Sequence, residues 1–93
     1  MKSIDDVNKD AITKRLRRIE GQVKGIQKMV ENDKYCGDVL IQVAAARSAL
    51  NSVGGLILEN YTKDCLKDYL DGSANEEALD ALVNTILKYT KQN

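Results

Sequence analysis

Apolar residues recur at helical spacing through the first third of the chain. From Ile12 to Val30 the separations alternate between four and three residues, which places these side chains on one face of an α-helix. The positions are Ile12, Leu16, Ile19, Val23, Ile26 and Val30. The polar stretch "ENDKY" follows, and Asn32 and Asp33 are predicted to break the helix and cap the next one. Residues 1–8 are polar and predicted to be flexible.

A second, longer helix is predicted from Tyr35 to about Tyr69, because nothing in this stretch stops a helix decisively. Gly54 and Gly55 weaken it by roughly 1 kcal/mol each relative to alanine, and they indicate close packing or a bend. A helix of about 30 residues is roughly 45 Å long, more than the width of a domain of this size. Its apolar residues extend beyond what two shorter helices can cover. We therefore expect an obligate oligomer, either an antiparallel helical dimer or a larger assembly.

The end of the long helix and the start of a third are marked by turn residues. The segment "LDGS" is a stop, with Gly72 suited to a left-handed cap. Ser73 followed by Glu76 fits a capping box. The apolar face of the third helix comprises Leu79, Leu82, Val83, Ile86 and Leu87. No strand pattern is present, so the sequence predicts an all-α fold: one domain, residues 1–93, with three helices and the middle one longest.

Composition narrows the class of protein. The chain is 43% hydrophobic but only 4% aromatic, and its formal net charge is +0. No apolar run approaches the ~20 residues of a membrane span, and the N-terminus lacks the apolar centre of a signal peptide. We therefore expect a cytoplasmic protein with no membrane partner, where a stable structural disulfide is disfavoured. Affinity for nucleic acid would require a local concentration of positive charge.

Such a concentration lies on the first predicted helix. Residues 11–28 carry six cations and one anion. Helical spacing turns most of them, including Arg17, Arg18 and Lys24, away from the apolar face. A solvated helix face would explain this pattern, but arginine favours phosphate because its planar guanidinium binds oxyanions in bidentate fashion. In a symmetric oligomer the charge is repeated over the width that duplex DNA requires.

The residues predicted to contact DNA are Lys14, Arg15, Arg17, Arg18 and Arg47. Arg47 is a separate case, because it lies on the apolar seam of the second helix between Val43 and Leu50. An ion pair at a helix interface explains it equally well. No short glycine-containing turn of helix-turn-helix size is present, so any DNA would be bound through a different helical surface.

Two cysteines and no histidine define the candidate chemistry. Cys36 lies in the first turn of the second helix, where the helix dipole favours an anion, and Cys65 lies 29 positions later. In a straight helix that separation is roughly 43 Å, so the thiols meet only if the helix folds back or if Cys36 approaches Cys65 of another, antiparallel chain. The spacing is equally consistent with two small core residues. It lacks the ligands of an ordinary zinc site, and no acid or base accompanies the thiols as in an enzyme.

The segments "RIEGQVKGI" and "YCGDVLIQVAAARSAL" closely resemble the copper-sensitive operon repressor family of bacterial regulators. The resemblance covers residues 12–87. It implies a three-helix subunit that forms an antiparallel dimer and then a disc-like homotetramer, a dimer of dimers. It also implies repression through binding of operator DNA, which is relieved by an inducer at an intersubunit thiol site. Arg15 matches a basic position implicated in DNA binding in this family.

The branch of the family depends on the residues around the thiols. Copper(I) sensors place a histidine four residues before the second cysteine, where this chain has Tyr61. Tyr35 matches a supporting residue of that branch, and its acidic partner would be Asp80. The branch that senses persulfides keeps both cysteines, lacks the histidine and usually has asparagine there, which here is the neighbouring residue, Asn60.

The sequence thus favours a repressor released when persulfide or polysulfide reacts with Cys36 of one chain and Cys65 of another. No cofactor or resident metal is expected. The alternative inducer is copper(I), bound linearly by the same two thiolates. A thiol-dependent enzyme or a metallochaperone is a distant alternative.

Overall fold

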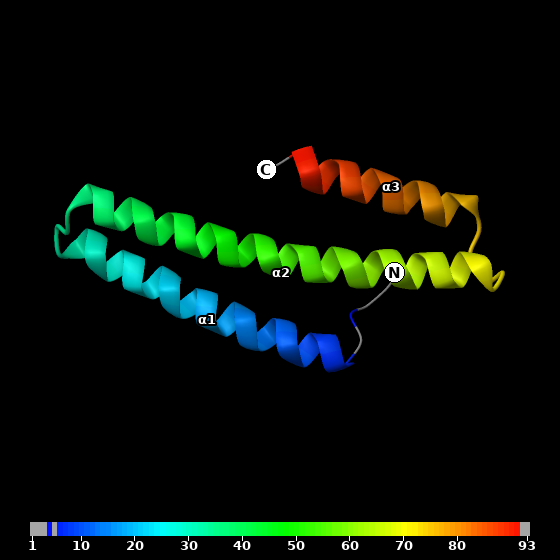
Figure 1. Ribbon diagram of the computed structural model, residues 1–93, viewed down its shortest axis with the longest axis horizontal. Helices are drawn as coiled ribbons and strands as arrows, with labels where there is room; N and C mark the ends of the chain where they lie inside the picture. The colour runs from blue at the N-terminus through cyan, green and yellow to red at the C-terminus, as the bar shows by residue number, and fades with distance from the viewer. Residues whose placement is uncertain (1–3, 5, 92–93) are drawn as a thin grey trace. The chain divides into compact units, whose positions relative to one another are not determined.

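The chain forms three α-helices in the computed structural model, which describes residue 4 and residues 6–91 (Figure 1). Helix α1 spans Asp6–Glu31, α2 spans Cys36–Leu70 and α3 spans Glu76–Lys91. The prediction of an all-α chain with a long central helix is confirmed. Helix α1 begins six residues before the first position of its apolar seam. The predicted flexibility of residues 1–8 falls partly on residues outside the described part, whereas residues 6–8 are helical.

Two compact units share helix α2 between them. The N-terminal unit, Asp5–Leu56, contains α1 and the first part of α2. The C-terminal unit contains the last part of α2 and all of α3, within Ile57–Asn93. In each unit the neighbouring helices run side by side in opposite directions (Figure 1). Helix α2 continues through Gly54 and Gly55 without a break, and a Cβ added at Gly55 would find no atom within 4 Å, so no close packing requires this glycine in the isolated chain.

Helix α1 ends in a hydrogen-bonded turn around Asp33. This residue has a positive φ of 55°, which is rare outside glycine, asparagine and aspartate. The amide of Lys34 donates to the carbonyl of Met29 at 3.0 Å, and the amide of Asp33 donates to Val30 at 3.2 Å. These two bonds form a Schellman motif that satisfies the last carbonyls of α1.

The first amides of α2 are satisfied by Tyr35, not by the residues predicted from the sequence. Asp38 and Val39 donate their amides to the carbonyl of Tyr35 at 3.0 and 3.2 Å. The break at Asn32 and Asp33 is confirmed, but their predicted role as the new N-cap is wrong. Asp33 lies three residues before the helix and is already used in the turn that ends α1.

The turn between α2 and α3 repeats the Schellman pattern with glycine. Gly72 has a φ of 86°, as its predicted left-handed cap requires. The N-cap of α3 is Asn75, whose Oδ1 accepts a hydrogen bond from the amide of Ala78 at 3.2 Å. The predicted capping box from Ser73 to Glu76 does not form, since the Ser73 hydroxyl instead bonds the Asp68 carbonyl and the Asp71 carboxylate.

Few side chains are buried in either unit. In the described residues of the N-terminal unit they are Ile12, Ile19, Ala46 and Val53. In those of the C-terminal unit they are Cys65 and Leu82. Much of the predicted seam of α1 stays open, for example Val30 at 61% exposure. On α2, Leu40 and Ile41 are 67% and 65% exposed, which leaves a large apolar surface for other chains to cover.

By length and composition alone, helix α2 could also cross a membrane, contrary to the estimate from its apolar runs. An 18-residue window of α2 has a mean hydropathy of 1.2, and only 6% of that window is buried. Core helices of proteins that never enter a membrane meet the same criterion once their apolar faces are covered. The window therefore identifies α2 as the helix that an assembly has most reason to bury.

Candidate functional site

The two predicted sensing thiols have different surroundings. Both cysteines are free, with Cys36 exposed and Cys65 buried. Cys36 is the first residue of α2 and belongs to the N-terminal unit, whereas Cys65 belongs to the C-terminal unit and retains 6% exposure. In the isolated chain, a reagent in solvent therefore reaches the Cys36 sulfur first.

The predicted neighbour of Cys36, Tyr35, is held by a contact across the thiol position. Its ring lies over Gly37, where an added Cβ would be only 2.5 Å from Cε2 of Tyr35. Glycine is thus required for this ring position, although Tyr35 itself remains 75% exposed. The phenol is consequently available beside an exposed thiol in the first turn of α2.

The residues predicted to line the site near Cys65 are placed less uniformly. Tyr61 is half-buried and lies one turn before Cys65, so both share one side of α2. Asn60 lies five positions before Cys65, about 140° away around the helix, and its Nδ2 donates to the Asp64 carboxylate at 3.4 Å. Asp80 is exposed on α3. Only Tyr61 shares the helix face of the buried thiol.

Metal-ligating side chains do not converge within one chain. Among residues 4 and 6–91, no group of three histidine, cysteine, aspartate or glutamate side chains could hold a metal ion. The only thiols are Cys36 and Cys65, in different units. A metal site therefore needs ligands from more than one chain, or an ion satisfied by two of them.

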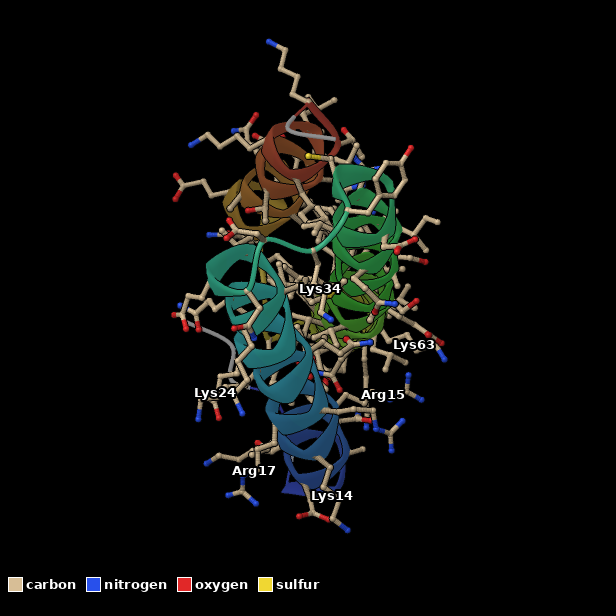
Figure 2. The ribbon with its side chains drawn as sticks, turned by 90° about the vertical axis from the view of Figure 1, so that its left-hand side faces the viewer. Lys14, Arg15, Arg17, Lys24, Lys34 and Lys63 are labelled. Atoms are coloured by element: carbon tan, nitrogen blue, oxygen red, sulfur yellow. The ribbon has the colours of Figure 1, made fainter. Side chains whose placement is uncertain are left out.

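The basic residues of α1 do not form one continuous stripe. Figure 2 shows Arg15 on the side of α1 next to the first part of α2, whereas Arg17 and Lys24 point to the opposite side. Lys14 is paired with Asp10 at 3.3 Å, an exposed contact between successive helical turns. The predicted single outward face is wrong in this respect, because the packing of α2 divides it into two flanks.

Arg18 belongs to the flank near α2, contrary to its predicted outward position. It lines a depression of about 270 Å³ within the N-terminal unit, together with Arg15, Ile19, Gln22, Ala49 and Ser52. The sequence reasoning missed Gln22 and Ser52. The available signal was helical spacing, since Gln22 lies one turn after Arg18 on the same flank of the apolar seam.

Arg47, the remaining predicted DNA contact, is exposed on α2. In the part of the chain that the structure describes, no ion pair joins it to an acidic residue. Its alternative role in an ion pair would therefore need an acidic residue of another chain.

Comparison with known sequences identifies a family over most of the chain. Residues 8–88 match the family described as "Metal-sensitive transcriptional repressor". The chain is 46% identical over 83 residues to the copper-sensing transcriptional repressor CsoR of Bacillus subtilis (strain 168), covering 89% of this chain and 82% of that protein. It is 53% identical over 58 residues to the copper-sensing transcriptional repressor RicR of Mycobacterium tuberculosis (strain ATCC 25618 / H37Rv), covering 62% of this chain and 60% of that protein.

Solved structures share the same arrangement of helices. The crystal structure of the copper-sensing repressor CsoR with Cu(I) from Geobacillus thermodenitrificans NG80-2 superposes with a TM-score of 0.85 at 40% identity, covering 97% of this chain and 94% of that one. The nickel-responsive transcriptional regulator InrS superposes with a TM-score of 0.81 at 32% identity, covering 96% and 98%.

Proposed function

Because this chain belongs to the family of metal-sensitive transcriptional repressors, we propose that it binds operator DNA and releases it when an inducer engages its two cysteines. The chain is not an enzyme, since the proteins it matches are transcriptional regulators. The observation that carries the proposal is the pair of thiols in a chain without histidine, one exposed at the start of α2 and one buried near its end.

The working form is a cytoplasmic homotetramer built from antiparallel dimers, without a membrane partner. The small core of each unit and the exposed apolar side chains of α2 support this assembly, because a lone subunit leaves them in water. Antiparallel pairing would bring Cys36 of one chain to Cys65 of another. Arg15, Arg17 and Arg18 would then be repeated on the assembled surface facing the DNA, with Lys14 and Arg47 as further contacts.

Copper(I) is the inducer that the comparisons favour, which reverses the order suggested by the sequence. The two CsoR proteins and the RicR protein compared above are described as copper-sensing. The donor set fits this ion, since copper(I) prefers soft ligands and two thiolates satisfy it in linear coordination. Cys36 and Cys65 from different chains would supply them, without a third ligand from Tyr61.

Persulfide remains the second candidate because Tyr61 occupies the position of the histidine in copper sensors. The exposed Cys36 thiolate would attack the outer sulfur of a persulfide, RSSH, forming Cys36–S–SH and releasing the thiolate RS⁻. The thiolate of Cys65 from another chain would then displace hydrosulfide, HS⁻, and leave a disulfide between the chains. A polysulfide donor would leave additional sulfur in this bridge.

Operator binding by the reduced protein tests the proposal. Fluorescence anisotropy with a labelled promoter fragment is measured before and after one equivalent of copper(I) per thiol pair, and in parallel before and after a cysteine persulfide donor. Release by copper(I) alone is the expected result, whereas release by the persulfide alone would assign the second candidate. Cys36→Ser should abolish release but keep DNA affinity, and a reduced wild-type protein that fails to bind at moderate salt would refute the repressor function.

A further inference from the structure

The depression between α1 and the first part of α2 has an apolar base and a polar rim. Ile19 is buried and Ala49 is half-buried, so they form its base. The remaining lining residues carry polar groups and are Arg15, Arg18, Gln22 and Ser52. All six lie in the N-terminal unit. A water molecule takes about 30 Å³ of liquid, so the volume of about 270 Å³ holds a tetrahedral oxyanion with several waters.

The charge of this depression is positive and uncompensated. No acidic side chain lines it, and neither Arg15 nor Arg18 forms an ion pair in residues 4 and 6–91. Lys14, by contrast, already has Asp10 as a partner. Two guanidinium groups on one concave surface present planar donors to a single anion, and this geometry suits a phosphate group.

Gln22 supplies a second, independent observation. Its Oε1 atom is buried, and no hydrogen-bond donor within the described chain reaches it. A buried acceptor without a partner is unusual, and a water or a ligand commonly supplies the missing donor. A water bound here can donate one hydrogen to Oε1 and the other to a phosphate oxygen, as bridging waters do in protein–DNA interfaces.

We propose that this depression is the seat of a single backbone phosphate of the operator, which Arg15 and Arg18 bind directly and Gln22 binds through a water. The assignment rests on the proposed DNA-binding function and divides the basic residues into two roles. The flank near α2 holds the phosphate. The opposite flank, with Arg17 and Lys24, contributes charge at longer range (Figure 2).

Salt dependence of operator affinity separates the two roles. Arg18→Gln and Arg17→Gln remove the same charge from adjacent positions, so each controls for the other. The slope of log affinity against log salt falls in magnitude by about 0.9 for each phosphate that the protein no longer neutralises. We expect that fall with Arg18→Gln and a clearly smaller change with Arg17→Gln, and equal changes in the two variants would overturn the assignment.

A second pair of variants tests Gln22. Gln22→Glu places a negative charge in the depression, whereas Gln27→Glu adds the same charge at an exposed position of α1 outside it. Operator affinity should fall roughly tenfold with Gln22→Glu and change little with Gln27→Glu. Circular dichroism and the oligomeric state check that each variant is folded. A misfolded Gln22→Glu protein leaves the decision to the arginine pair.

The remaining outcomes distinguish the possible failures. A wild-type protein that does not bind the promoter fragment would refute the proposed function, and this seat with it. A wild-type protein that binds DNA while all four variants bind equally well would overturn only the seat. Titration of inorganic phosphate forms the last arm: if it binds wild type but not Gln22→Glu while operator affinity is equal in both, the depression holds a free anion instead of DNA.

Discussion

Replacing each of two glycines by alanine should change stability in opposite directions, although neither new methyl group meets another atom. At Gly72 and at Gly55, an added Cβ would find nothing within 4 Å, so contact forces cancel from the comparison. Gly72 has a φ of 86°, and a left-handed conformation costs an L-residue about 1–2 kcal/mol. Gly55 lies inside α2, where alanine is favoured over glycine by about 1 kcal/mol. The two variants should therefore differ by about 2–3 kcal/mol per subunit.

Urea unfolding followed by far-UV circular dichroism measures this difference. Wild type, Gly72→Ala and Gly55→Ala must be compared at one subunit concentration, because the stability of an oligomer depends on it. Similar denaturant slopes would show that the variants expose the same surface on unfolding. A Gly72→Ala protein as stable as wild type would refute the backbone argument. A destabilised Gly55→Ala protein would show that a second chain approaches this face in the assembly.

Three further substitutions test individual contacts. Gly37→Ala must displace the Tyr35 ring, since the new Cβ would lie 2.5 Å from its Cε2, and unchanged ring resonances in NMR spectra would contradict that contact. Tyr61→His adds a third donor on the helix face of the buried thiol and should raise copper(I) affinity about tenfold or more, measured by competition with a chromophoric chelator. Asn75→Ala removes the cap that accepts the amide of Ala78 and should lower the free energy of unfolding by about 1 kcal/mol, and an unchanged unfolding midpoint would argue against this cap.

The helices were predictable because their apolar patterns and stops are local features of the chain. The left-handed Gly72 follows from the preference of glycine for that conformation. The caps were harder, because several adjacent residues could serve. Asn75 caps α3 while Ser73, two residues earlier, bonds backward to Asp68, and the choice depends on where the preceding turn places each side chain.

The candidate site was predictable in its residues but not in its surroundings. Two cysteines in a chain without histidine are visible in the sequence, whereas the burial of Cys65 and the exposure of Cys36 depend on packing. The division of the basic helix face also follows from packing, because α2 lies along one flank of α1 and not the other. Sequence periodicity fixes which residues share a flank, but it cannot say that Arg18 and Gln22 meet Ser52 of another helix.

The separation of Cys36 and Cys65 into different units has a genetic consequence. If each inducer site takes one thiol from each of two chains, a Cys36→Ser chain and a Cys65→Ser chain are both unresponsive alone. Mixed together, they would assemble dimers in which one site regains both thiols and the other has none. Two defective alleles in one cell would then restore part of the response, an intragenic complementation that a site within one chain could not give.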